Sequence, residues 1–548
     1  MNLRDTPLRR SAKPAVTTDS LGGRWGIAVA LVLLSGCGGA MLPPVPALSP
    51  FAGGTLSAYD AALRHYLVGR DSAALGAVLQ AGPKDALLRA MQRGLVLRRL
   101  GEFERSNVAL QEADRLARER YTKSISQNLA AFLVSDNSLD FYPSALEWSM
   151  LHFYGMLNYL ELGDRESALV EARRANQLVR RYANDNPGRT YTVDAAVQYM
   201  AGILQWSAGD LNDAVVSLRQ SLAAYERYED AFGVPPPTAV AEDLVRVAGQ
   251  LGLHDVAAEV RRSYLDDPGT EYRPPSGEDT GELVLLIERG FVAHRAEQKL
   301  YIPILAEEKD SILEGDAESA VAAAVLVLAR TVIIMNELAR SGREFPRHED
   351  GVIIATVGSA VGLDLISLAW PVYELEAFIA RDTRVSVDGG SARVPHLLQD
   401  LSAVAVRDFE ERKTTVMLRM VVRGLLKEAG IAVAEAKGEQ LGGEVGGFLA
   451  RVASRAAAAA TERADTRTWS TLPGEISLVR STLPAGRHVI EVSYVGLNGM
   501  ERTETIQVEV VPGQVTIASV ALVGGDGGAT ERFAQARRGV VHKVPERR

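Results

Sequence analysis

The stretch from Trp148 to Val179 carries two consecutive helical patterns of hydrophobic residues. In the first, apolar residues recur at i, i+3, i+4 and i+7, at Phe153, Met156, Leu157 and Leu160. Such spacing places one apolar stripe on a helix. Gly163 ends this helix, and Asp164 can cap the next one. In the second, small residues repeat the spacing at Ala168, Ala172, Ala175 and Val179. The pattern predicts a closely packed antiparallel helical hairpin, which needs stacked neighbours to cover its remaining apolar face.

Glycine-centred turns recur on both sides of this hairpin. They lie at Gly69, Gly101, Gly163, Gly209 and Gly252. Gly94 and Gly202 lie seven residues before two of these glycines, and Ala214 follows the fourth turn at hairpin spacing. These features resemble tetratricopeptide repeats, although the irregular distances between turns indicate degenerate repeats with insertions. We therefore predict an all-α tetratricopeptide-like solenoid over residues 56–265, with Ala172 and Ala214 buried between helices.

Beyond a boundary rich in Pro, Gly and acidic residues, short apolar runs alternate with helical ones. We expect a mixed α/β middle region over residues 282–465. Its predicted elements are a buried strand at 282–287, an edge strand at 299–304, a helix at 318–340, a β-hairpin at 383–394 and a strand or, more in keeping with its pattern, a helix at 403–429. The apolar run 352–370 contains Asp364, which favours a buried or interface segment over a transmembrane helix.

Four alternating segments near the C-terminus are separated by Gly and Pro turns. They are residues 476–479, 487–494, 503–511 and 514–522. This pattern predicts a small antiparallel β-sandwich over 466–523, followed by a disordered basic tail at 524–548. The expected fold class is α+β multidomain: a helical-hairpin solenoid, a mixed middle region and the β-sandwich.

The first 36 residues have the pattern of an export signal. A basic leader precedes a short apolar run at 26–34, and Leu34-Ser35-Gly36-Cys37 follows. This tetrapeptide resembles the lipobox of bacterial lipoproteins, which implies lipidation of Cys37, the single cysteine of the chain. The alternatives are a buried core cysteine and a short uncleaved membrane anchor. Residues 37–55 are rich in proline and are expected to form an extended tether.

Composition excludes nucleic acid as an expected partner. Removal of residues 1–36, which carry five basic and two acidic side chains, changes the net charge from −9 to about −12. Nucleic-acid binding requires basic surface that this chain does not concentrate. Hydrophobic residues make up 47% and charged residues 24%, as in ordinary globular proteins.

The sequence contains no recognisable reactive motif. The histidines have no metal-ligand spacing, and the trio His348-Glu349-Asp350 consists of adjacent residues that rarely converge on one ion. The glycine-rich stretch 442–447 lacks the lysine of a phosphate-binding loop. We therefore expect no enzyme activity, no metal and no cofactor, although an active site assembled from distant residues stays open.

Several sequence segments carry features that a generic tetratricopeptide repeat does not explain. They are Tyr142 with Glu147, Asn158-Tyr159-Leu160, residues 170–174, Asn212-Asp213-Ala214 and residues 465–469. They resemble an uncharacterised family of bacterial lipoproteins with tetratricopeptide-like repeats and a C-terminal β domain. The resemblance implies a periplasmic protein anchored to the envelope and no known enzymatic activity. Gly38 after the cysteine is typical of outer-membrane sorting in enteric-type bacteria.

These observations predict a non-catalytic adaptor that binds an envelope protein or peptide through its helical repeats. The candidate contact residues are Asn158, Glu171, Arg174 and Asn212, which would line the concave groove of the solenoid. The alternative for the charged ones is solvated helix surface with local ion pairs. A second hypothesis is an envelope glycan or small-ligand binding module in the middle or C-terminal β region. The sequence identifies neither the partner nor the oligomeric state.

Overall fold

The structure is a computed structural model of the 548-residue chain. It describes residues 58–67, 69–82, 85–126, 141–186, 189–265, 279–313, 317–341, 364–374, 380–496, 499–522 and 540–543. The predicted signal, the tether and Cys37 lie outside the described residues, as does the apolar run before residue 364.

The helical half consists of hairpins, as the sequence predicts. Its helices are α1 (Ala58–Leu67), α2 (Asp71–Leu79), α3 (Ala86–Arg99), α4 (Phe103–Ser126), α5 (Ala145–Glu161), α6 (Arg165–Asp185), α7 (Ala195–Ala208), α8 (Leu211–Phe232), α9 (Thr238–Gln250) and α10 (His254–Tyr264). The five turn glycines named above all have φ between 71° and 89°. This left-handed backbone is open to glycine without the steric cost that other residues meet, which explains why glycine ends the first helix of each hairpin.

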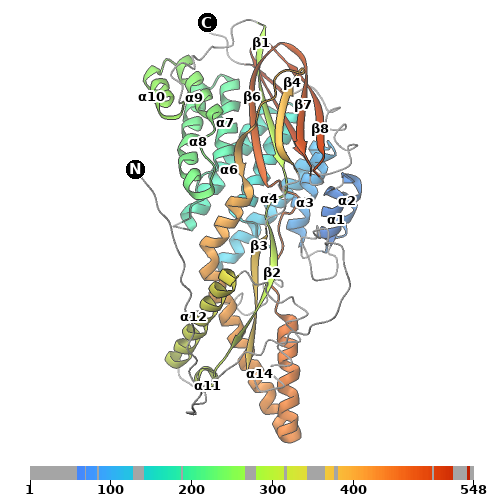
Figure 1. The fold of residues 1–548 in the computed structure, drawn as a ribbon, viewed down its shortest axis with the longest axis vertical. Coiled ribbons are helices and arrows are strands. Elements are labelled where there is room, and N and C mark those ends of the chain that lie inside the picture. Colours follow the sequence, from blue (N-terminus) through green and yellow to red (C-terminus); the bar gives the residue numbers. More distant parts are fainter. Residues whose placement is uncertain are drawn as a thin grey trace, which may run out of the picture. The chain divides into compact units, whose positions relative to one another are not determined.

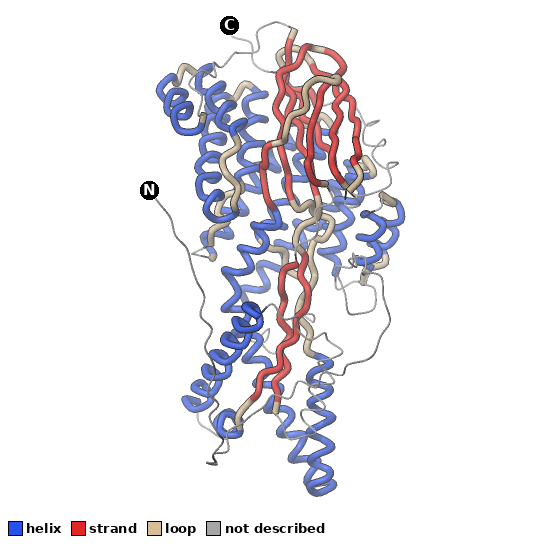
Figure 2. The backbone as a smooth tube through the Cα atoms, in the orientation of Figure 1, coloured by secondary structure: helices blue, strands red, loops and turns tan. Residues whose placement is uncertain are grey.

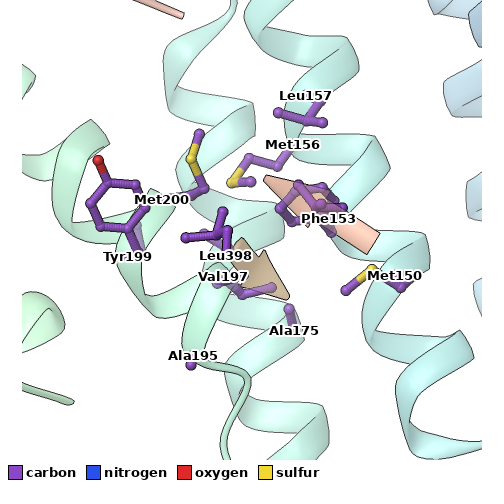
Figure 3. Close-up of a cluster of buried hydrophobic side chains, with 14 of the residues drawn as sticks. Met150, Phe153, Met156, Leu157, Ala175, Ala195, Val197, Tyr199, Met200 and Leu398 are labelled. Carbon is purple, nitrogen blue, oxygen red and sulfur yellow. The ribbon is translucent and has the colours of Figure 1, made fainter. Parts of the chain in front are cut away.

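The small residues of the pattern lie where helices pack closely, as predicted. A Cβ atom at Gly94 would lie 2.4 Å from Leu110 Cδ2, and one at Gly202 would lie 2.7 Å from Leu218 Cγ. Ala172 and Ala214 are fully buried. The second helix of a hairpin therefore packs directly onto the backbone of the first. Figure 3 shows the apolar cluster in which α5, α6 and α7 meet, including Phe153 and Met200.

The second half of the chain contains two larger sheets and a ribbon. Its elements are β1 (Thr280–Arg289), β2 (His294–Pro303), α11 (Ala306–Leu313), α12 (Ala317–Ser341), β3 (Leu365–Glu374), β4 (Arg381–Val387), β5 (His396–Asp400), α14 (Leu401–Thr461), β6 (Glu475–Pro484), β7 (Gly486–Val495), β8 (Glu501–Val510), β9 (Gln514–Leu522) and β10 (Val540–Lys543). The strand orders are β10-β9-β1-β6-β5, β4-β7-β8 and β2-β3. Figure 2 shows these strands beside the helices. Among the described helices, none combines the length and apolarity needed to cross a bilayer.

The predicted division between a middle region and a separate C-terminal domain is wrong. Strand β1 pairs with β6 in antiparallel and with β9 in parallel orientation, so the sandwich includes residues from before the expected boundary at 465/466. It is also not antiparallel throughout. The buried strand expected at 282–287 is present, but it lies at the centre of the five-stranded sheet, and β4 joins β7 in the other sheet. The tail contributes β10 at the sheet edge.

Strand β1 has two apolar faces because different layers cover it. Leu283, Leu285 and Ile287 pack against the β4-β7-β8 sheet, whereas Val284 and Leu286 belong to the core that contains α5, α7 and α9. A strand buried on both sides reads as a continuous hydrophobic run, as this one does. The chain therefore forms three layers here: helical hairpins, a five-stranded sheet and a three-stranded sheet (Figure 1).

Helix α14 accounts for the two remaining segments. The segment 403–429 is helical, and so is the glycine- and alanine-rich stretch that follows. A non-helical residue, Gly443, lies within α14 at φ 63°. Gly438 and Gly446 then come so close that a Cβ at Gly438 would lie 2.6 Å from the carbonyl oxygen of Gly446. The glycine segment is thus a closely packed helical turnaround. The hairpin expected at 383–394 reduces to one bridge between Val385 and Arg393.

Candidate binding site

A cavity of about 670 Å³ lies between α4, α5 and α6 of the helical half. Its lining residues are polar, cationic and aromatic: Gln111, Asp114, Arg118, Tyr121, Trp148, Arg174, Gln177, Leu178, Arg181 and Tyr182. Its size falls within the range of ligand-binding pockets. Two of its walls belong to second helices of consecutive hairpins, and α5 supplies Trp148 between them.

His152 lies beneath the cavity between two carboxylates. Its Nδ1 is 2.6 Å from Glu171 Oε2, and its Nε2 is 3.4 Å from Asp114 Oδ1. Arg174 donates from Nη1 to the other oxygen of Glu171, at 2.7 Å. Because His152 and Glu171 are buried, this arrangement fixes the floor of the cavity and leaves Arg174 partly exposed above it.

Asp114 receives hydrogen bonds from two cavity residues. Trp148 donates from Nε1 at 2.8 Å, and Arg118 donates from Nε at 2.9 Å. Burial alone would raise the pKa of the Asp114 carboxyl, but interactions with His152, Arg118 and Trp148 hold this pKa well below its usual range. Burial likewise opposes the charge of His152, yet Asp114 and Glu171 hold the imidazole pKa above its usual value. The site therefore favours a charged imidazolium between two carboxylates.

Aromatic rings form one wall of the cavity. Tyr121 meets Trp148 edge to face with ring centroids 5.8 Å apart, and the guanidinium of Arg181 lies 5.4 Å from the centre of the Tyr121 ring. At the other side Gln111 donates to the hydroxyl of Tyr159 at 2.9 Å. The cavity can thus offer both ring faces for packing and guanidinium or amide groups for hydrogen bonds.

The sequence-predicted contact residues do not converge. Glu171 and Arg174 meet at the cavity, in the local ion pair that the alternative interpretation expected. Asn158 has no exposed surface: it accepts from Arg98 Nη1 at 2.7 Å and donates to Ser106 and Asn107. Its placement on an open groove is therefore wrong, and it instead joins α3, α4 and α5. Asn212 is exposed in the first turn of α8 and is not among the lining residues.

The first helices of the second and third hairpins, α3 and α5, do not present an open groove either, because residues 468–472 of the same chain occupy their inner side. Gln92 of α3 donates to the carbonyl oxygen of Thr468 at 3.2 Å and to Ser470 Oγ at 3.0 Å. The backbone N–H of Trp469 donates to Glu147 Oε1 of α5 at 3.0 Å, and its fully buried ring packs edge to face on Tyr154. The available cavity lies elsewhere, where the second helices α4 and α6 meet α5.

Most of the residues that line the cavity are not indicated by any local sequence pattern. Asp114 and Arg118 have i, i+4 spacing on α4, and Trp148 and His152 have the same spacing on α5, but nothing local shows that these pairs face one another. Within the part of the chain that the structure describes, no group of three or more His, Cys, Asp or Glu residues has the geometry of a metal site.

We expect His152→Gln to change how stability depends on pH. Because its pKa is raised in the native state, protonated His152 contributes stability fully below about pH 6.5, and this is lost as pH rises through the native pKa. At pH 6 the free energy of unfolding of the variant should be about 3 kcal/mol lower than that of the wild type, since two carboxylates lose their buried partner. Its stability should then fall less with rising pH.

Urea unfolding at a series of pH values from 5 to 9 measures this dependence. His254→Gln, at an exposed position in α10, is the matched control. Equal slopes of stability against pH for wild type and His152→Gln would contradict the role assigned to the imidazolium.

Comparisons with known proteins give only distant similarities. One similar structure is that of the Rap conjugation gene regulator of the plasmid pLS20 in complex with the Phr* peptide. Its sequence is 11% identical to this chain, and the match covers 56% of this chain and 67% of that chain with a TM-score of 0.23. A Rap protein complexed with competence and sporulation factor is 13% identical, with a TM-score of 0.23, over 50% of this chain and 64% of that chain. No protein-family model and no curated protein matches the sequence.

Proposed function

We propose that this protein is a non-catalytic, lipid-anchored adaptor of the bacterial cell envelope that binds a peptide or protein segment in the α4–α5–α6 cavity. The observation that carries the proposal is the composition of this cavity, in which three arginines, two glutamines and three aromatic rings surround one space. Helical-repeat surfaces commonly hold peptides in this way.

The geometry favours an extended peptide that offers backbone carbonyls and a carboxylate. Arg174 uses one donor on Glu171, and a guanidinium has five, so further donors face the cavity. Gln111 and Gln177 are exposed at its edges and can pair with a peptide backbone. Trp148 and Tyr121 supply the apolar wall against which a side chain of the ligand packs.

Localisation is part of the proposal and is supported by the sequence. The lipobox-like tetrapeptide that ends at Cys37, followed by a proline-rich stretch, is typical of a chain that is lipidated and then held away from the membrane. We place the folded part in the periplasm, at the outer membrane.

Arg174→Ala should weaken partner binding while the fold is retained. Loss of a charge-assisted hydrogen bond is worth about 1.5–3 kcal/mol, which corresponds to roughly a tenfold to hundredfold rise in Kd. The mature protein and the variant are purified from membrane extracts, and co-purifying proteins are quantified by mass spectrometry. Arg173→Ala is the matched control, because Arg173 is an exposed arginine on the same helix outside the cavity lining.

Recovery of the same partners at the same yield with Arg174→Ala would reject the cavity as the binding site. If envelope glycans bind the mature protein and no protein co-purifies, the glycan-binding hypothesis replaces the adaptor. A catalytic turnover detected with the purified protein would overturn the non-catalytic assignment.

A further inference from the structure

Helix α12 is apolar on both of its faces. Its inner side buries Ala323 and Val327, and Val327 belongs to the core formed with β2, β3 and α14. Its outer side carries six exposed residues without a charge among them: Ala322, Val325, Leu326, Ala329, Val332 and Ile333. Leu326 is 57% exposed and Ile333 67%. A helix that is apolar all round is normally buried all round, so this outer face calls for a covering partner.

The charged residue in the middle of α12 does not interrupt this face. Arg330 donates to both carboxylate oxygens of Glu308, at 2.9 and 2.6 Å, and to the carbonyl oxygen of Pro303 at 2.7 Å. These partners belong to α11 and β2, so the guanidinium is used to fix α12 against its neighbours. The exposed stripe from residue 322 to residue 333 is therefore uncharged over three turns.

The same part of the fold exposes a second apolar group. Around the turnaround of α14, Leu441 is 91% exposed and Val445 is 70% exposed, with Phe448 and Leu449 on the following turn. Of the 19 exposed large hydrophobic side chains among the described residues, ten lie within 305–333 and 418–449. This concentration distinguishes the region from the helical hairpins, whose exposed apolar residues are scattered singly and need no partner.

We propose that the outer face of α12 lies on the lipid surface to which the chain is anchored. The proposal rests on the lipid anchor of the proposed function. Twenty residues separate Cys37 from Ala58, where α1 begins, so the tether spans at most about 70 Å. Lipid at Cys37 keeps the folded part within that distance of the bilayer, which makes weak, reversible contact by an uncharged apolar face effective.

Vesicle flotation of the mature chain, residues 37–548, with Cys37→Ser tests this contact without the lipid. Vesicles of phosphatidylethanolamine and phosphatidylglycerol are used at low and high salt. The chain should float with the vesicles, and binding should not weaken at high salt, since the contact is apolar and salt screens the repulsion between the acidic chain and the anionic phosphatidylglycerol. Leu326→Glu with Ile333→Glu should weaken vesicle binding at least tenfold.

The matched control is Val108→Glu with Val216→Glu, which places the same charges at apolar residues that are 63% and 53% exposed on α4 and α8. Retained binding by this control, with unchanged circular dichroism for both double variants, supports the proposal. Failure of the unlipidated chain to bind vesicles, or equal binding by both double variants, overturns it. A self-association that the α12 substitutions abolish would also overturn it, since a second copy would then cover the face.

Lipidation of Cys37 is measured separately, by mass spectrometry of the wild-type protein from membranes. Absence of the lipid with retained vesicle binding would refute the anchor and leave the α12 contact. Presence of the lipid without vesicle binding would refute the α12 contact and leave the anchor.

Discussion

Asp243→Ala is expected to lower the free energy of unfolding by about 3–5 kcal/mol, because it leaves a buried guanidinium without its main partner. Asp243 of α9 accepts two hydrogen bonds from Arg480 of β6, at 2.6 and 3.0 Å, and one from the hydroxyl of Tyr199 at 2.9 Å. Arg480 and Asp243 are both buried. The pair joins the helical hairpins to the five-stranded sheet.

Unfolding followed by helical circular dichroism and by tryptophan fluorescence measures this effect. Both signals should shift together, since the hairpins and the sheet share one core. Asp255→Ala, at an exposed position in α10, is the control. Adding Arg480→Leu to Asp243→Ala should restore part of the lost stability, as removing both charges avoids an unpaired buried ion. A shift of one signal without the other would contradict unfolding of the hairpins and the sheet as one cooperative unit.

Cys37→Ser should release the protein from membranes or leave an unprocessed precursor. Stable anchoring requires more than one acyl chain, and a lipoprotein carries several at this cysteine. Without the lipid, the α12 face holds the protein only reversibly, so washing removes the protein from the membrane. Fractionation of cells that express wild type and variant measures the result. A variant that is processed normally and remains in washed membranes like the wild type would contradict the anchor.

The helical half was predictable because its signals are local. Each turn glycine adopts a backbone conformation that its neighbours in the sequence already indicate, and Asp164 caps α6 by accepting from the backbone N–H of Ser167 at 3.0 Å. Small residues such as Ala172 lie at helix contacts because a hairpin leaves no room for larger ones. These rules apply within a few residues, so one sequence is sufficient.

The sheet arrangement was not predictable because its partners are remote. Glu282 of β1 lies opposite Thr482 on one side and Val515 on the other, and no local pattern identifies either neighbour. The sequence therefore indicated strands β1 and β6 to β9, but it assigned β1 to the wrong domain and did not predict strands β3 and β5. The occupation of the inner side of the hairpins by Trp469 was missed for the same reason.

The cavity combines both situations. Glu171 and Arg174 were expected because they are neighbours on one helix, whereas Asp114 and His152 come from two other helices. The groove position predicted for Asn158 is wrong because a polar residue on a helix does not have to face solvent. Its side chain instead satisfies Arg98, Ser106 and Asn107 in the interior, where an unpaired amide would be costly.

Site-specific photo-crosslinking in living cells tests the central claim, binding of a peptide or protein segment in the α4–α5–α6 cavity. A benzophenone amino acid is placed at Gln177, an exposed residue of the cavity lining, and in a second strain at Arg173 on the same helix. The account predicts a light-dependent adduct with a defined envelope protein from position 177 that is absent from position 173 and is lost when Arg174→Ala is added. No adduct from position 177, or the same adducts from both positions, would contradict it.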